Sequence, residues 1–279
     1  MKIRLFTFLL LAAVAMVRPG FAETSEIMVN LKLDNVDYVV NERIRAVVDI
    51  VNLSPDTINV GLPDSPDRFF VEVYRARDRE QIEPAVKTPF VADFLLESNE
   101  GQKLETFIGD HFALKTTGRY LAKPVLVHGG TRYEGQPRAF DVVPGMAVAS
   151  ALQMFSNHED LRREFELVYW NRKGRDHLFI KTKDFGAGEK SWATIDLGAV
   201  MKITKPTVSI LPTGEVVVFH RVDADNFLRS EFWSVPQGLE FHSRNVVQDP
   251  ETAGANRVRE LYKESGGIKP KENPWWKFW

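Results

Sequence analysis

Short stretches in which hydrophobic and polar residues alternate follow one another between residues 26 and 145. The clearest is Ile44–Asn52, where β-branched residues alternate in part with polar ones, a pattern typical of a strand with one buried face. Turn-forming groups such as Ser54-Pro55-Asp56 and His128-Gly129-Gly130 separate these stretches. The remaining predicted strands are Ile27–Leu33, Tyr38–Val40, Ile58–Leu62, Phe69–Arg77, Leu104–Ile108, Tyr120–His128 and Arg138–Val143. About eight short strands without long helices predict an all-β fold, with a two-sheet β-sandwich over residues 23–145.

Two short motifs near the end of this segment resemble a known kind of module. Thr117-Gly118-Arg119-Tyr120 leads into one strand, and Val142-Val143-Pro144-Gly145 ends the last one. Together with Asn41-Glu42 and Asn52 around an early strand, they resemble the immunoglobulin-like or fibronectin-like modules of bacterial exported proteins. The resemblance covers residues 26–145. It implies an immunoglobulin-like sandwich in which the Tyr120 hydroxyl bonds back to a nearby backbone group.

An internal repeat with an offset of 49 residues fills the chain from Arg163 to Val247. Under this shift Leu167–Arg172 falls on Val216–Arg221, and Trp192 falls on Phe241. The pattern of each repeat predicts a hairpin followed by a third strand that bears an aromatic residue. We therefore interpret residues 146–248 as a small two-repeat antiparallel β domain.

The first hairpin and the aromatics of the repeat lead to two further expectations. Lys173-Gly174 supplies the hairpin turn, and we expect a cross-strand ion pair between Arg172 and Asp176 beside it. Trp170 and Trp192 both have aromatic counterparts in the second repeat. Periodic aromatics of this kind favour packing in a core.

A second resemblance concerns the end of the first repeat. Thr182-Lys183-Asp184-Phe185-Gly186, with Trp192 after it, resembles a stretched form of the Asp-box turn of sialidase-type β-repeats. The resemblance implies a turn around Asp184, although Trp192 follows later than in that motif. Two repeats are too few to close a propeller, which needs four or more blades. A compact domain is therefore the interpretation of this region.

The N-terminal residues have the features of a secretory signal peptide. Lys2 and Arg4 precede the apolar run Leu5–Val17, and Ala22 closes a small-residue ending. This order predicts a signal peptide over residues 1–22 that is cleaved after Ala22. We expect an exported protein of the periplasm, the cell surface or the extracellular space.

Composition narrows the class of protein further. The chain has 279 residues, with 36 Lys and Arg against 38 Asp and Glu, and no cysteine. The near-neutral balance excludes a basic nucleic-acid-binding protein, and the lack of cysteine excludes a disulfide-stabilised scaffold. The six histidines show no metal-ligand spacing. The sequence therefore predicts neither a metal site nor a cofactor.

The chain ends in Trp275-Trp276-Lys277-Phe278-Trp279, the strongest candidate binding feature of the sequence. A short helix is predicted over residues 249–266, and a flexible tail that carries the aromatic motif over residues 267–279. Clustered large aromatic side chains are seldom left exposed to water. Three surfaces could bury these side chains: the protein's own surface, a partner protein on which the tail docks, and a membrane interface, where tryptophan is favoured.

These features favour a non-catalytic binding or assembly protein that recognises an envelope or extracellular partner through its β domains and its tail. The alternative is a glycan-binding module that uses Trp192 and Trp233 as a stacking surface. A third hypothesis is a hydrolase, which requires acidic and histidine side chains of the second domain to meet in a pocket. The residues available for it are Asp184, Asp196, His220, Asp223 and His242. No catalytic residue is assigned from the sequence.

Overall fold

The computed structural model has an all-β fold, which confirms the fold class predicted from the sequence. It describes residues 26–61, 65–155, 161–186 and 192–249 together with Glu260, and only the backbone of Trp192. The predicted signal peptide, C-terminal helix and aromatic tail lie outside the described residues, apart from Asp249 and Glu260. The described residues form nineteen strands and one four-residue helix.

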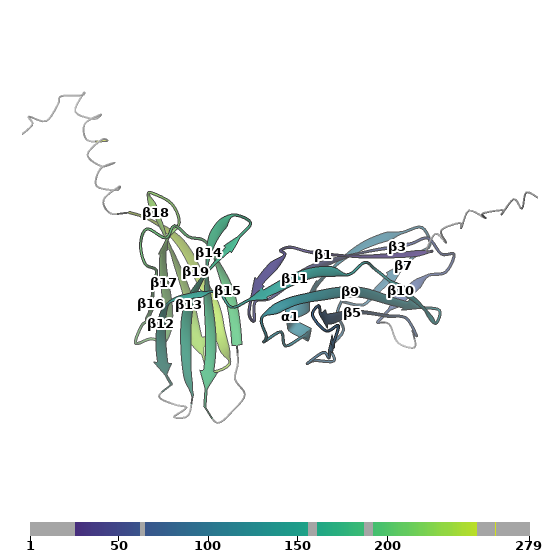
Figure 1. The fold of residues 1–279 in the computed structure, drawn as a ribbon, viewed down its shortest axis with the longest axis horizontal. Coiled ribbons are helices and arrows are strands. Elements are labelled where there is room, and N and C mark those ends of the chain that lie inside the picture. The colour runs from purple at the N-terminus through teal and green to yellow at the C-terminus, as the bar shows by residue number, and fades with distance from the viewer. Residues whose placement is uncertain (1–25, 62–64, 156–160, 187–191, 250–259, 261–279) are drawn as a thin grey trace, which may run out of the picture.

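The first unit, β1–β11, is a β-sandwich with two main sheets (Figure 1). One sheet has the strand order β1-β3-β8. The other has the order β2-β11-β9-β5-β6, with β10 also paired to β9, and β4 and β7 form a separate pair. The bounds are β1 Ile27–Leu33, β2 Asp37–Val39, β3 Arg45–Asn52, β4 Ile58–Val60, β5 Arg68–Arg75, β6 Gln81–Ile82, β7 Phe94–Leu96, β8 Gly101–Phe107, α1 Ile108–His111, β9 Gly118–His128, β10 Thr131–Glu134 and β11 Arg138–Val143.

Alternation along the strands places one row of side chains between these two sheets. Every second residue of β3 is fully buried, because successive side chains of a strand point to opposite faces. Three of them, Ala46, Val48 and Ile50, pack in one cluster with Tyr120 of β9 and Phe140 of β11. The Tyr120 hydroxyl donates a hydrogen bond to the carbonyl oxygen of Thr116 (2.8 Å), which is the local bond expected from its place after Gly118.

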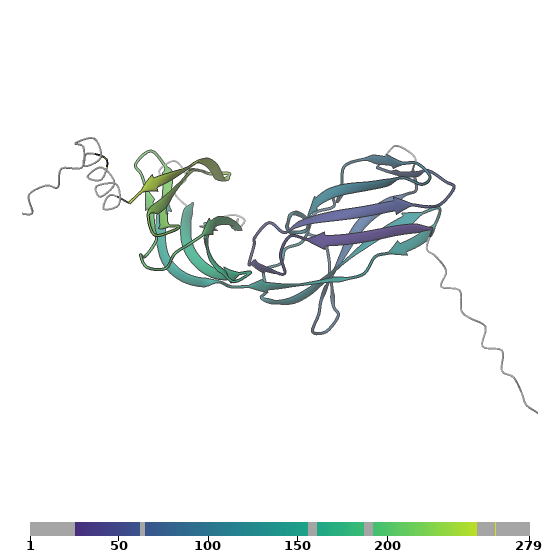
Figure 2. The ribbon, with the colours of Figure 1, turned by 90° about the horizontal axis from the view of Figure 1, so that it is seen from above.

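The second unit, β12–β19, consists of two four-stranded antiparallel sheets that face each other (Figures 1 and 2). Their orders are β12-β13-β14-β15 and β16-β17-β18-β19. The bounds are β12 Met146–Met154, β13 Arg162–Arg172, β14 Arg175–Phe185, β15 Trp192–Ala199, β16 Thr207–Ile210, β17 Glu215–Arg221, β18 Asn226–Val235 and β19 Gly238–Gln248. The core between the sheets contains Phe165, Leu167, Tyr169, Leu178, Ile180, Leu197, Val200, Val216, Val218 and Phe232.

Both repeats contain a hairpin, but the strands of the two hairpins pair in different registers. Lys173 and Gly174, both with positive φ (52° and 79°), make a two-residue turn between β13 and β14, as the sequence predicts. The second hairpin has four residues, 222–225, between β17 and β18. A gapless 49-residue shift therefore aligns the first strand of each hairpin and misplaces the pairing of the second. Each sheet also has a preceding strand, β12 or β16, that the repeat pattern does not predict.

The described aromatics of the repeat do not pack in the core between these sheets, contrary to the expectation. Trp170 lies on the outer face of its sheet and contacts the first unit, and Phe219 lies on the outer face of the other sheet and stacks on Phe227. Phe241 is 57% exposed. A shift of one residue along a strand moves a side chain to the opposite face, so an aromatic repeat alone does not fix which face is buried.

Candidate functional site

The chain crosses from the first unit to the second through Pro144-Gly145, between β11 and β12. Gly145 has a φ of +73°, and a Cβ atom on it would lie 2.9 Å from Cγ2 of Val168. Both the conformation and the close approach require glycine there. The crossing therefore brings the start of β12 directly against β13 and leaves the two units side by side (Figure 1).

A small apolar cluster joins the units. Val39 of the first unit packs with Val168 and Phe179 on the outer face of the second unit's first sheet, and all three are buried. Trp170 extends this contact and donates its indole N–H to the carboxylate of Asp37. The outer face of this sheet is thus covered by the first unit where β13 and β14 approach their turn.

Backbone bonds also cross the junction. The N–H of Thr194 in β15 donates to the carbonyl oxygen of Asn41 (3.2 Å), and its hydroxyl donates to that of Val40 (2.7 Å). Thr194 and Glu42 form an isolated parallel bridge. Because β15 is the edge strand of its sheet, residues 40–42 occupy part of an edge that would otherwise be open to pairing.

A buried ion pair lies behind this contact. The Arg172 guanidinium is 2.6 Å from Oε2 of Glu42 and 3.0 Å from Oδ2 of Asp196, and its side chain is 5% exposed. His177 Nδ1 lies 3.1 Å from Asp196. The prediction of an ion pair between Arg172 and Asp176 is wrong, because Arg172 pairs instead with Glu42 of the first unit, whose carboxylate is more buried than that of Asp176. Asp176 instead binds Lys202 (2.8 Å).

Burial and pairing act in opposite directions on these charges. Burial raises the pKa of the Glu42 carboxyl, and the hydrogen bond and charge of Arg172 only partly oppose it. Burial is the largest influence on Arg172 and disfavours its charged form, but the hydrogen bond to Glu42 and the negative charges of Glu42, Asp196 and Asp37 together outweigh it and raise the pKa of the guanidinium. Arg172 therefore remains a permanent cation at the junction.

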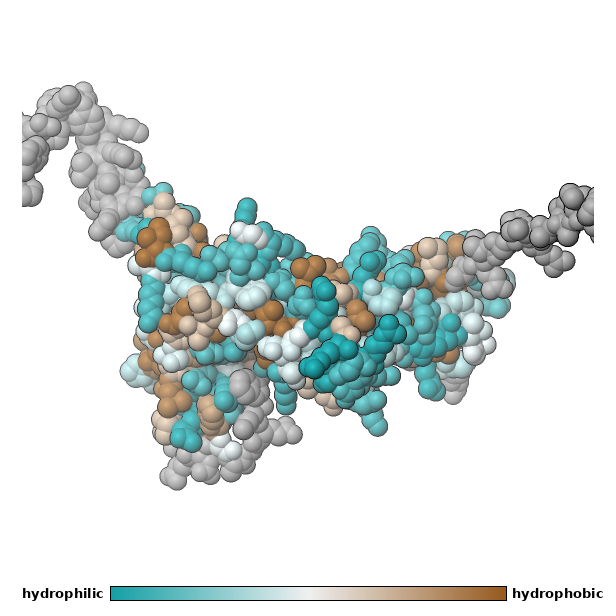
Figure 3. Space-filling model, in the orientation of Figure 1, coloured by the Kyte–Doolittle hydropathy of each residue, from teal (hydrophilic) through white to brown (hydrophobic). Residues whose placement is uncertain are grey.

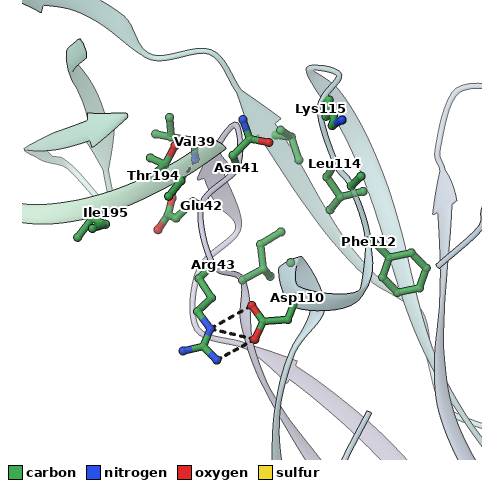
Figure 4. Close-up of a pocket in the computed structure, with 15 residues that line it drawn as sticks. Val39, Asn41, Glu42, Arg43, Asp110, Phe112, Leu114, Lys115, Thr194 and Ile195 are labelled. Carbon is green, nitrogen blue, oxygen red and sulfur yellow. Dashed lines mark hydrogen bonds and ion pairs between the residues drawn. The ribbon is translucent and has the colours of Figure 1, made fainter. Parts of the chain in front are cut away.

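A pocket of about 440 Å³ opens next to this junction (Figure 4). Its apolar lining comes mostly from the first unit, with Val39, Ile44, Leu114 and Val142, and the edge strand β15 closes one side. The volume lies within the range of sites that hold small ligands or protein side chains. Pockets of this kind often lie between domains, where two rigid bodies supply the walls.

An ion pair between Arg43 and Asp110 lies at one end of the pocket. Arg43 contacts both carboxylate oxygens of Asp110, with the shortest distance, 2.7 Å, from Nη2 to Oδ2. The guanidinium also lies over the ring of Phe107, 3.6 Å from its centre. The charge of Asp110 is therefore neutralised within the protein.

At the other end of the pocket lie two polar side chains that are not paired in this way. Asn41 and Lys115 lie across the pocket from the Arg43–Asp110 pair (Figure 4). Asn41 has a φ of +64°, a conformation that asparagine adopts more readily than most residues. Among the residues that the structure describes, no ion pair or side-chain hydrogen bond involves Lys115 or the Asn41 amide.

The acidic and histidine residues proposed for a hydrolase lie in different environments. Asp184 is in β14 rather than in a turn, and it makes a buried ion pair with Arg163 (2.6 Å). Asp196 belongs to the junction, and His220 is buried inside the second unit. Asp223 accepts hydrogen bonds from the backbone and side chain of Asn226 in its own turn. In the described part of the chain these groups do not share a pocket.

The proposed stacking surface is described only in part. Trp233 is 37% exposed on the outer face of its sheet, and its ring lies 5.3 Å from that of His242. The side chain of Trp192 and all of Trp275–Trp279 lie outside the described residues. These five tail residues thus remain a predicted anchor.

Exposed hydrophobic side chains are scattered over the second unit. On the face shown in Figure 3 they form several separate areas rather than one patch. The large exposed side chains include Met146, Leu152 and Met154 of β12 and Phe241 and Val246 of β19. Isolated exposed apolar residues are normal in soluble proteins. The junction pocket is therefore the stronger candidate site.

The described residues include neither a metal-binding cluster nor a membrane-spanning helix. They contain no group of three or more histidine, aspartate or glutamate side chains placed to hold a metal ion. None of their helices has the length and apolar character needed to span a membrane.

Sequence reasoning does not reach the junction pocket. In the sequence, Asn41 and Glu42 stand out only through a resemblance of strands, and no local pattern marks Lys115 or Thr194 as site residues. The available signal is Asn41 itself, because asparagine before a predicted strand often marks an unusual backbone position. Nothing in the pattern connects that position with β15, far along the chain.

Comparisons with known proteins identify no family. No protein-family model and no curated protein matches the chain. Among solved structures, a similar chain is the sporulation control protein Spo0M from Bacillus subtilis, with 10% sequence identity and a TM-score of 0.30. The match covers 86% of this chain and 97% of that chain. At this TM-score the likeness carries no conclusion about function.

Proposed function

We propose that the protein is an exported, non-catalytic binding protein that recognises an envelope or extracellular partner at the junction of its two β units. The observation that carries this proposal is the 440 Å³ pocket between the units. Its walls are held by the buried Arg172–Glu42 pair and by the backbone bonds of Thr194. A preformed pocket binds with little loss of conformational entropy, since its walls need not be ordered on binding.

The arrangement of titratable groups supports binding rather than catalysis. Catalytic acids and bases are usually gathered in one cleft with convergent geometry. Here Asp110 and Glu42, the carboxylates that line the pocket, are each engaged by an arginine. Because their oxygens already accept hydrogen bonds from these guanidinium groups, both carboxylates are less free to contact a substrate.

Two parts of the proposal rest on the sequence. Export rests on the signal-peptide pattern of residues 1–22, and the second anchor is the aromatic motif Trp275–Trp279. A tryptophan-rich segment on a spacer suits this role, because large aromatics dominate the energetics of protein interfaces.

The test is affinity capture from an envelope extract with matched variants of the full chain. Ala113→Trp places a large side chain in the pocket wall, and Ala113→Ser at the same exposed position is the control. A partner recovered with the wild type and with Ala113→Ser, but reduced about tenfold with Ala113→Trp, supports the junction as the site. Equal recovery with both variants would rule out this site.

A further variant that ends at Asn273 tests the tail separately. Loss of the partner with this truncation, while the protein still unfolds cooperatively, supports the tail as the second anchor. Full recovery would remove the tail from the binding mechanism.

Glycan binding is a second candidate, favoured by the exposed Trp233 on the outer sheet face. Aromatic faces stack on sugar rings much as they stack on other flat apolar ligands. The expected result is a rise in melting temperature with a soluble glycan, abolished by Trp233→Ala. If Trp233→Ala unfolds the domain instead, the tryptophan is structural and this candidate fails.

A further inference from the structure

The charged side chains that line the junction pocket differ in whether they have an ion-pair partner. Both carboxylates in its lining, Glu42 and Asp110, are held by Arg172 and Arg43 at 2.6 Å and 2.7 Å. Lys115 has no carboxylate partner among the described residues. With the pairs counted as neutral, Lys115 carries the one uncompensated charge among the described residues that line the pocket.

The apolar part of the pocket lies directly beside that charge. Leu114 precedes Lys115 in the chain, and Ile44 and Val142 also line the pocket. The Asn41 amide at this end has an N–H₂ donor and a carbonyl acceptor. This pair of functions matches the C=O and N–H of a peptide group. The Arg43–Asp110 pair, at the opposite end, offers no comparable unpaired charge (Figure 4).

We propose that the pocket binds a peptide segment of the partner that presents an apolar side chain next to a carboxylate. The apolar side chain lies against Ile44, Leu114 and Val142, the carboxylate meets Lys115, and a backbone amide of the segment meets Asn41. This inference rests on the proposed function and names the chemistry that the partner supplies. An ion pair at the rim of a pocket mainly sets specificity and the rate of association, whereas the buried apolar group supplies affinity.

The test uses blocked nine-residue peptides made of glycine and serine with one leucine followed by aspartate, asparagine or lysine. Binding to the full chain is followed by NMR, through the backbone amide signals of Asn41, Ala113 and Lys115. We expect the aspartate peptide to bind about tenfold more tightly than the lysine peptide at low salt. We expect the difference to shrink in 0.5 M salt, because exposed charge pairs are screened.

Charge reversal at one residue provides the decisive variant. Lys115→Glu should reverse the order, so that the lysine peptide binds more tightly than the aspartate peptide. Lys103→Glu, at an exposed lysine on β8 outside the pocket, should leave the order unchanged. If the wild type binds all three peptides equally, or if Lys115→Glu leaves the order unchanged, the inference is wrong.

The failure of this inference can be told apart from failure of the proposed function. If no peptide binds but partner capture still depends on Ala113→Trp, the junction remains the site and the acidic segment is excluded. If capture is unaffected by Ala113→Trp, the site itself is excluded, whatever the peptides do. A free carboxylate such as hexanoate is the last arm: if it shifts the same signals as strongly as the aspartate peptide, a small molecule rather than a peptide is the ligand.

Discussion

The ring of His220 lies between the two sheets of the second unit and is 1% exposed. Neither ring nitrogen has a hydrogen-bond partner at normal geometry among the described residues. Burial of the ring, together with the positive charge of the Arg244 guanidinium, lowers the pKa of His220 to about 4. The nearby Ala199 carbonyl acts in the opposite direction, because it favours the charged form of the ring. A single residue therefore links the packing of this unit to pH.

The sign of this link follows from the two pKa values. The unfolded chain binds a proton at His220 near pH 6.5, whereas the folded protein does so only near pH 4. As pH falls between these values, the unfolded state gains protons that the folded state does not. The stability associated with neutral His220 is present above pH 6.5 and is lost as pH falls toward 4.

We expect His220→Leu to abolish about 3 kcal/mol of the fall in unfolding free energy between pH 7 and pH 4. Urea unfolding of wild type and variant across this range measures the difference. His242→Gln, which replaces an exposed histidine on β19, is the control and should track the wild type. Parallel curves for wild type and His220→Leu would contradict the prediction.

At the scale of elements, the turn between β18 and β19 is held by an arginine from another sheet. Arg163 of β13 is 1% exposed and binds both carboxylate oxygens of Asp184 (2.6 and 2.8 Å). Its Nη1 atom donates to the carbonyl oxygens of Val235 (2.7 Å) and Gly238 (2.5 Å) and to the Ser234 hydroxyl (3.1 Å). One guanidinium thus connects the two sheets of the second unit at one end.

Removing this arginine leaves a buried carboxylate and several carbonyl oxygens without a donor. We expect Arg163→Met to lower the unfolding free energy by about 3–5 kcal/mol, since an unpaired buried charge is strongly destabilising. Urea unfolding measures this loss. The double variant Arg163→Met/Asp184→Leu should recover part of it, because no carboxylate then remains uncompensated. A loss below about 1 kcal/mol, or a double variant no more stable than the single one, would refute this role.

The elements also show how far sequence patterns reach. The predicted strands Ile27–Leu33 and Arg138–Val143 match β1 and β11 residue for residue, because strands with one buried face alternate clearly. The three-residue strand β7 is not predicted, because a strand this short shows no clear period, whereas the predicted strand Tyr38–Val40 lies within one residue of β2. Whether the first unit is immunoglobulin-like and whether the repeat is related to sialidase-type repeats stay predictions.

At the scale of the whole molecule, the relative position of the two units depends on a few buried contacts. The Arg172–Glu42 pair, the apolar cluster around Val168 and the bonds of Thr194 lie within the same small area. Buried ion pairs of this kind specify one arrangement more than they add stability, and losing one partner is costly. The pocket depends on this arrangement because both units line it.

We expect Arg172→Met to separate the unfolding of the two units. Glu42 and Asp196 would then face each other at the junction without a cation, so the contact weakens while each unit keeps its own core. Calorimetry should show two resolved transitions, and small-angle scattering a larger radius of gyration. Lys202→Met removes a surface ion pair of the same unit and should change stability by less than about 0.5 kcal/mol. A single transition at the wild-type temperature in Arg172→Met would contradict the prediction.

The sequence by itself determines the all-β fold, most of the longer strands and the two-residue turn at Lys173-Gly174. These follow from local rules, since alternation, turn residues and backbone preferences act over a few positions. The faces that are buried in the repeat, the partner of Arg172 and the pocket depend on contacts between residues far apart in the chain. Only the tertiary structure decides them, because which carboxylate or apolar face is nearest is settled when the two units pack together.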